Sequence, residues 1–312
     1  MNSDLIVSVS PHYHKAGSTT QRVMLDVIIA MIPALIASCL IFGFRSLLLV
    51  AISAANCVLL EWLWNKLMKK TDTVSDLSAV VTGMLLAFNV PATMPIWQLM
   101  VGDFIAVIIV KMLFGGLGCN FVNPALVGRV AMMLSFTSSM TNYGTEVAKV
   151  DVLSGATPLA AMGELDFSHF MTLFLGQHGG VLGETCALAL LIGGVYLCAR
   201  QVIKPTIPCF YIGSVLVFTF LFSGFNGTQA VLSLFSGGLM LGAIFMATDY
   251  VTSPLTFKGQ WIYAVGCGFI TTMIRLFANS AEGVSFAILL MNLLVPYING
   301  WSKTKPLGGV KA

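Results

Sequence analysis

One hydroxyl group stands out in a run of small residues, the segment SGATPLAAMG at 154–163. Threonine is a good helix N-cap, and proline is favoured at the first helical position. The pattern therefore predicts a helix that is capped by Thr157, starts at Pro158 and stops at Gly163. On residue types alone, a helix start is the favoured interpretation, and Thr157 carries the hydroxyl that is open to chemistry.

Ionisable residues inside apolar runs form the second set of candidates. A charge at the centre of a bilayer costs about 2.5–3.5 kcal/mol on insertion scales, so such residues are usually functional or paired. Asp103 and Arg129 lie deepest and are candidates for lining a polar interior, where an ion, a cofactor or each other could be the partner. Lys111 and Glu184 also fall in apolar runs. Three carboxylates lie near enough to a run's end to be solvated: Asp26, Glu61 and Asp249.

Cysteine and histidine spacing does not predict a metal or cluster site. None of the seven cysteines forms a C-x-x-C pair, and an iron–sulfur cluster needs about four thiolates. Most of them lie in apolar runs and are interpreted as small hydrophobic residues. No H-E-x-x-H motif and no G-x-G-x-x-G fingerprint is present, so we expect neither a protein-bound metal nor NAD on this chain.

Composition predicts an integral membrane protein. Charged residues make up 9% of the 312 and apolar residues 57%, with a mean hydropathy of +0.90. A soluble chain carries about 25% charged residues. No basic stripe interleaved with aromatic residues is present, so nucleic acid is not an expected partner, and membrane lipid is.

Hydropathy predicts ten membrane spans of mostly apolar residues. The third and fifth are short and interrupted by polar or helix-breaking residues, so tilted or broken helices are expected there. The ten ranges are 23–43, 46–65, 76–92, 96–114, 121–138, 180–199, 206–224, 229–248, 260–279 and 284–301.

Charge placement predicts the orientation of these spans. With a cytoplasmic N-terminus, eleven of the 16 Lys and Arg residues fall on the cytoplasmic side, two fall outside and three lie within spans. This asymmetry is typical of the positive-inside rule. Both termini are therefore expected in the cytoplasm, and the long connection at 139–179, which holds Thr157, is expected outside.

The fold class expected is an all-α integral membrane protein of about ten transmembrane helices in two inverted five-helix repeats, some of them broken. The segment at 77–95 resembles that at 232–254, since each has an apolar run, a glycine and Ala-Thr before a proline. The regions expected are a cytoplasmic lead (1–22), a first half (23–138), an external loop (139–179), a second half (180–301) and a cytoplasmic tail (302–312).

Six motifs in order give the chain a family resemblance. They are SPHYH, GGLGCNFVNPALVGR, SGATPLA, GGVLGETCALALLIGG, FMATDYVTSP and SFAILLMNLLVPYING, and they run from residue 10 to residue 300. The chain resembles the D subunit of the Rnf complex and, more distantly, the B subunit of the sodium-pumping NADH:quinone oxidoreductase. In this family the D-x-x-S-G-A-T pattern is the site of covalent FMN attachment through a phosphoester.

The resemblance implies a site and a role. FMN would be esterified to Thr157, within a motif completed by Asp151, Ser154, Gly155 and Ala156. A helix N-terminus would stabilise the attached phosphate. The chain would relay electrons in an ion-translocating ferredoxin:NAD⁺ oxidoreductase that moves Na⁺ or H⁺ across a prokaryotic plasma membrane. Its partners would be the A-, B-, C-, E- and G-type Rnf subunits, and a flavin transferase for maturation.

The same resemblance implies a second flavin, and two rival functions stay open. The quinone-reducing relative also holds a noncovalent riboflavin. The regions expected to form such a pocket, or an ion site, are GGLGCNFVNPALVGR (115–129) and FMATDYVTSP (245–254). The candidate residues there are Asn120, Asn123, Arg129, Thr248 and Asp249. One rival is the B-type subunit of the quinone-reducing enzyme, which the short lead before the first span disfavours. The other is a small-solute channel of inverted-repeat fold, which needs no outward SGAT loop.

Overall fold

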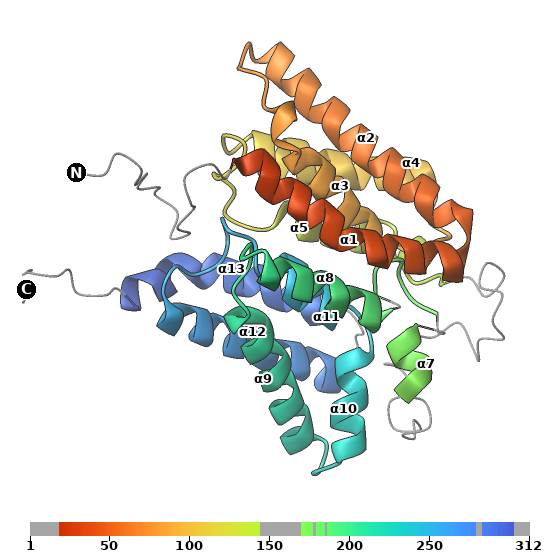
Figure 1. Ribbon diagram of the computed structural model, residues 1–312, viewed down its shortest axis with the longest axis vertical. Coiled ribbons are helices and arrows are strands. Elements are labelled where there is room, and N and C mark those ends of the chain that lie inside the picture. Colours follow the sequence, from red (N-terminus) through yellow and green to blue (C-terminus); the bar gives the residue numbers. More distant parts are fainter. Residues whose placement is uncertain (1–18, 144–169, 177–178, 185, 279–282, 303–312) are drawn as a thin grey trace, which may run out of the picture.

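A computed structural model of the chain describes residues 19–143, 170–176, 179–184, 186–278 and 283–302. These residues are mainly helical, as expected for an all-α membrane protein, and within them the sole β-type pairing is an isolated bridge between Pro91 and Val181. The helices lie in two groups. Figure 1 shows α1 to α5 in the upper part of the molecule and α8 to α13 in the lower part.

The N-terminal group precedes residue 143. Its helices are α1 (Thr20–Phe42), α2 (Phe44–Leu67), η1 (Val74–Asp76), α3 (Ser78–Phe88), α4 (Ile96–Phe104), the π-helix η2 (Ile105–Met112), α5 (Pro124–Ser135) and α6 (Thr137–Met140). Gly43 separates α1 from α2 with φ of 79°, a left-handed conformation that glycine adopts without a steric penalty.

The C-terminal group follows α7 (Phe170–Leu175). Its helices are α8 (Ala187–Ala199), α9 (Thr206–Phe222), α10 (Gly227–Phe235), α11 (Leu239–Leu241), the π-helix η5 (Gly242–Met246), α12 (Phe257–Phe277) and α13 (Gly283–Trp301). Helix packing joins the groups where α1 lies against α8 and where α5 lies against α13.

Each of the ten predicted spans contains a helix, but several of these helices are too short to cross a bilayer alone. Among the described residues, α1, α2 and α13 are long and apolar enough to cross, and α10 with α11–η5 forms a pair bent by 65°. With a rise of about 1.5 Å per residue, the 11 residues of α3 cover roughly half of a ~30 Å hydrocarbon core. The expected interruption of the third and fifth spans is confirmed in α3 and α5, and α8, with 13 residues, is only slightly longer.

The chain after α3 pairs with the chain before α8. Leu182 donates its backbone N–H to Val90 O at 3.0 Å, and Gly183 donates to Phe88 O at 2.8 Å. A Cβ at Gly183 would lie 2.5 Å from Phe88 Cβ, so this approach requires glycine. Non-helical backbone is tolerated inside a membrane protein where it is buried in protein and its hydrogen bonds are satisfied, as they are here. The two helix groups are thus joined at their broken helices.

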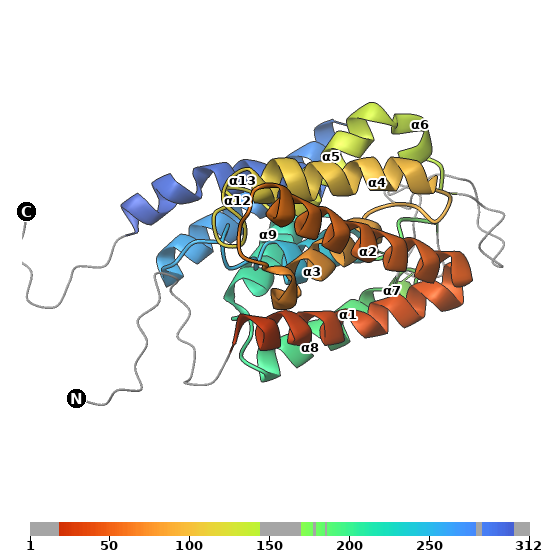
Figure 2. The same ribbon diagram turned by 90° about the horizontal axis from the view of Figure 1, so that it is seen from above.

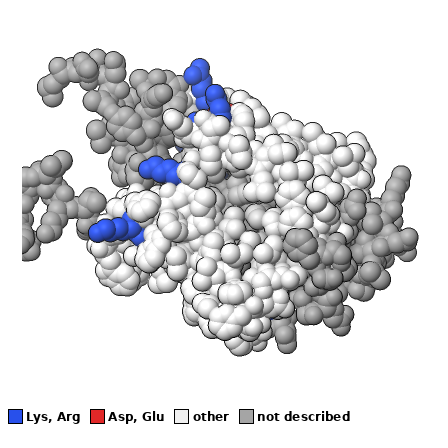
Figure 3. All heavy atoms as spheres, turned by 60° about the horizontal axis from the view of Figure 1, so that its bottom comes forward, with Lys and Arg blue, Asp and Glu red and all other residues white. Residues whose placement is uncertain are grey.

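Surface charge gathers at one end of the molecule. In the view of Figure 3, the visible Lys and Arg side chains lie at one end, and the remaining described surface of that face carries almost no charge. Figures 1 and 2 show that α1 starts and α13 ends toward the same end. Large apolar side chains are exposed on many helices, including Leu40 (82%) and Trp301 (80%), as expected of surfaces that face lipid or other proteins.

Candidate functional site in a cavity between the helix groups

A cavity of about 100 Å³, which we call the central cavity, is lined by both helix groups. It brings together the two segments that the sequence predicts as regions for a flavin or ion pocket, those at 115–129 and 245–254. Four of the predicted site residues line it. Its polar lining is Ser78, Thr82, Lys111, Asn120, Asn123, Thr248, Asp249 and Tyr250.

Asn123 holds the two breaks together. Its side-chain oxygen accepts from the backbone N–H groups of Ala125 (3.1 Å) and Leu126 (3.4 Å), which caps α5, and Pro124 occupies the first helical position. Its amide nitrogen donates to Met246 O at 3.3 Å, at the end of η5. One buried side chain therefore both starts a helix of the N-terminal group and ties it to the C-terminal group.

The turn after η5 presents a carboxylate to the cavity. Asp249 accepts from Val251 N at 3.4 Å and from Thr252 Oγ1 at 3.2 Å, and Thr248 donates to Ile244 O at 2.6 Å. Burial raises the pKa of Asp249, and those two hydrogen bonds oppose the shift. Asp249 is half-buried, so the solvation expected from its place at the end of an apolar run is partial.

Arg129, the fifth predicted residue in these segments, does not line the central cavity. It is buried, and its Nη2 lies 2.8 Å from Glu184 Oε1, while its Nη1 donates to Asn89 Oδ1. Gly238, at the break between α10 and α11, lies against the pair, since a Cβ there would be 2.4 Å from Glu184 Oε1. Helix α5 and the ends or breaks of α3, α8 and α10 therefore meet at one buried ion pair. The sequence identified Arg129 and Glu184 as charges within apolar runs, but it did not show that they pair.

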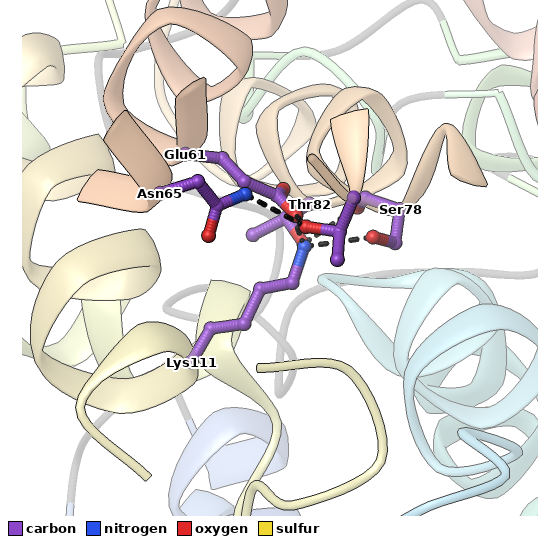
Figure 4. Close-up of polar contacts among 6 residues, drawn as sticks. Glu61, Asn65, Ser78, Thr82 and Lys111 are labelled. Carbon is purple, nitrogen blue, oxygen red and sulfur yellow. Dashed lines mark hydrogen bonds and ion pairs between the residues drawn. The ribbon is translucent and has the colours of Figure 1, made fainter. Parts of the chain in front are cut away.

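A second buried ion pair lies beside the cavity. Lys111 Nζ is 2.8 Å from Glu61 Oε2 and 2.7 Å from Ser78 Oγ, and Figure 4 shows the lysine reaching from η2 toward both. Thr73 donates to Glu61 Oε1 at 2.5 Å and accepts from Asn65 at 3.0 Å. The expectation that Glu61 is merely solvated is wrong: the residue is 1% exposed, because α3 and η2 cover this face of α2.

Asp103 and Arg129 are not partners. Asp103 is fully buried between α2 and α4, where Ser53 Oγ lies 2.6 Å from one carboxyl oxygen and Asn56 Nδ2 lies 3.0 Å from the other. Within the described part of the chain, no ion pair involves Asp103. The side chains that hydrogen-bond to Asp103 are therefore polar but uncharged.

The carboxylate of Asp26 joins α1 to the end of α8. Tyr196 donates to Asp26 Oδ1 at 2.9 Å, and Arg200 Nε lies 3.3 Å from the same oxygen. Asp26 is 8% exposed, so its expected solvation by water is replaced by contacts between the two helix groups. Arg200 remains exposed to solvent, which limits the strength of this ion pair.

The motif predicted to carry FMN lies outside the described residues. Asp151, Ser154, Gly155, Ala156 and Thr157 all fall in the range 144–169. For a noncovalent flavin, the central cavity provides the test of fit. Small-molecule sites usually measure about 300–1,000 Å³. At about 100 Å³ the cavity has room for water but not for a three-ring flavin unless its walls move.

Comparison with known proteins decides the family. The NQR2, RnfD, RnfE family matches residues 6–308. The chain belongs to this family. Among its relatives, the D subunit of the "Na(+)-translocating ferredoxin:NAD(+) oxidoreductase complex" of Acetobacterium woodii is 45% identical, over 99% of this chain and 96% of the relative.

Two further relatives extend the comparison. The D subunit of the "Proton-translocating ferredoxin:NAD(+) oxidoreductase complex" of Clostridium ljungdahlii is 36% identical over 97% of this chain and 96% of its own length. The D subunit of the "Ion-translocating oxidoreductase complex" of Actinobacillus succinogenes is 34% identical over 96% of each chain. Membership of the NQR2, RnfD, RnfE family thus confirms the resemblance predicted from the six motifs.

Proposed function

We propose that the chain is the D subunit of an Rnf-type ion-translocating ferredoxin:NAD⁺ oxidoreductase in a prokaryotic plasma membrane. The observation that carries this proposal is the 45% identity to the D-type protein of such a complex over nearly the full length of both chains. A helical membrane scaffold with buried ion pairs at its broken helices supports it. The partners would be the other Rnf subunits.

The proposal includes FMN attached covalently to Thr157. The threonine hydroxyl would form a phosphoester with the FMN phosphate, placed there by a flavin transferase, and the bound flavin would supply the electron-carrying group. Gly155 has no side chain and Ala156 only a methyl group, so these residue types would leave room for the transferase beside Thr157, and a proline at 158 would restrict the backbone after it. The gathering of Lys and Arg at one end supports a cytoplasmic position for both termini and an external one for the loop.

The coupling ion is either Na⁺ or H⁺. The names of the two relatives at 45% and 36% identity specify different ions, so sequence similarity at this level does not choose between them. A noncovalent riboflavin stays a prediction, and it would require the walls of the central cavity to separate. Chromatography of flavin released by acid from the purified complex measures it directly.

A denaturing gel of the purified complex tests the covalent attachment. Under ultraviolet light the wild-type chain should give a fluorescent band, Thr157→Ala should abolish it, and Thr157→Ser should keep part of it because the hydroxyl remains. Intact mass spectrometry should show the added mass of one FMN. Fluorescence that persists in Thr157→Ala would show that the flavin is attached to another residue. A polypeptide of unmodified mass in the assembled complex would favour the small-solute channel instead.

A further inference from the structure

One face of α2 forms a buried polar stripe. Ser53, Cys57, Glu61 and Asn65 follow one another at four-residue intervals, and each is at most 1% exposed. Residues four apart lie on the same side of a helix, so this face is continuous. It is covered by α3, α4 and η2. Apolar packing at Leu49 and Val50 precedes the stripe on α2, but four successive buried polar positions are not needed to pack a membrane helix.

Asp103 lies at the Ser53 end of this stripe. Its carboxyl group contacts Ser53, Asn56 and the Cys57 thiol, and all three groups are neutral. An ionised carboxylate that is fully buried without a cation is costly, because its lost hydration is not recovered by neutral partners. Lys111, eight residues further along the chain, is already paired with Glu61, since its Nζ lies 2.8 Å from Glu61 Oε2.

The hydrogen bonds of Ser53 indicate whether Asp103 is protonated. Its Oγ lies 2.9 Å from Gly83 O and 2.6 Å from Asp103 Oδ1. A hydroxyl has one hydrogen, a carbonyl oxygen can only accept, and an ionised carboxylate can also only accept. With Asp103 ionised, one hydrogen would have to serve both oxygens. With Asp103 protonated, its O–H donates to Ser53 and Ser53 donates to Gly83, so each bond has its own hydrogen.

The stripe is connected to the central cavity at Glu61. Lys111 and Ser78 line that cavity, and Lys111 is bonded to Glu61 of the stripe. Glu61 and Cys57 are one turn apart on α2, about 6 Å along the axis. The chain from the cavity through Glu61 and Cys57 to Asp103 therefore consists of groups that carry or accept protons.

We propose that Asp103 is a membrane-embedded proton-binding site, neutral at rest, that exchanges its proton with the central cavity along the polar face of α2. The exchange is a simple transfer: the proton leaves the carboxyl group toward the cavity, and the carboxylate takes one back by the same route. This deepens the proposed role in ion coupling, because it assigns a proton site to this chain. It does not depend on the attached flavin.

Infrared spectroscopy of the purified complex tests the neutral carboxylic acid. The wild type should show a carbonyl band of a protonated carboxyl that disappears in Asp103→Asn and remains in Asp76→Asn, a half-buried carboxyl outside the stripe. Ser53→Ala should shift this band, because it removes the acceptor of the Asp103 proton, and this arm serves if Asp103→Asn does not assemble. Identical spectra for all four proteins would overturn the proposal.

Two further measurements test the route and the ion. Transfer to D₂O should shift the carbonyl band of Asp103 as its proton exchanges for deuterium. The shift should be fast in Cys57→Ser, which keeps a hydroxyl on the route, and slow in Cys57→Val, which does not. Equal exchange rates in the two variants would overturn the route. A band that vanishes when Na⁺ replaces K⁺ at constant ionic strength would show metal binding and overturn the proton assignment. The Thr157→Ala complex should keep the band, so loss of flavin attachment and loss of the proton site are separate results.

Discussion

Arg129 Nη2 lies 2.8 Å from Glu184 Oε1, although the two residues are 55 positions apart in the sequence. Both side chains are less than 10% exposed. The arginine belongs to α5, and the glutamate lies just before α8, so the contact crosses between the helix groups. A buried ion pair of this kind fixes which elements meet, because leaving either charge alone is strongly unfavourable.

Gly238 should not tolerate a side chain. In Gly238→Ala the new Cβ would lie 2.4 Å from Glu184 Oε1 and force the ion pair apart, so we expect a destabilised or unassembled complex. The matched control is Gly213→Ala in α9, where a Cβ meets nothing within 4 Å. Thermal unfolding of the purified complexes measures both. Equal midpoints for the two variants would show that the helix break accommodates the methyl group.

Glu61→Gln should destabilise the protein because it leaves Lys111 buried without its counter-charge. Breaking one partner of a buried pair costs about 3–5 kcal/mol. The double variant Glu61→Gln/Lys111→Met removes both charges and should recover much of that loss. Chemical denaturation followed by tryptophan fluorescence provides the measurement. If the double variant is no more stable than Glu61→Gln, the pair does not account for the loss.

Asn123 combines two roles that substitutions can separate. Asn123→Ala removes the cap of α5 and the bond to Met246 O, and a lost N-cap alone costs about 0.5–2 kcal/mol. Asn123→Asp keeps the cap but loses the amide donor, so it should fall between the wild type and Asn123→Ala. Thermal midpoints rank the three proteins. An Asp variant as unstable as the Ala variant would give the larger role to the bond with Met246.

Asp249 should make stability depend on pH. Burial raises its pKa in the folded protein above the ordinary value of about 3.9, so the folded state binds this proton more tightly than the unfolded state. Its stabilising contribution is complete below pH ~3.9 and is lost as pH rises through the raised value. Asp249→Asn should therefore gain stability relative to the wild type toward neutral pH. Thermal midpoints across the acidic to neutral range check this, and parallel curves would contradict it.

The pattern of apolar runs was sufficient to predict where helices lie but not how far each extends. All ten predicted ranges contain a helix, since twenty apolar residues in sequence leave the backbone few other choices in lipid. The short lengths of α3 and α8 and the 65° bend near Gly238 depend on contacts between distant segments. The sequence predicted that the segments at 115–129 and 245–254 form a flavin or ion pocket, and the structure brings both segments to one cavity.

The sequence by itself determined the membrane class, the family and the position of the D-x-x-S-G-A-T motif, because each depends on residue type and local order. Only the tertiary structure decided the partners of the buried charges. Lys111 pairs with Glu61, Arg129 with Glu184 and Asp26 with Arg200, whereas Asp103 is held by neutral groups. The physical reason is that a charge in a low-dielectric interior is stabilised only by atoms within a few ångströms, and packing alone sets which atoms those are.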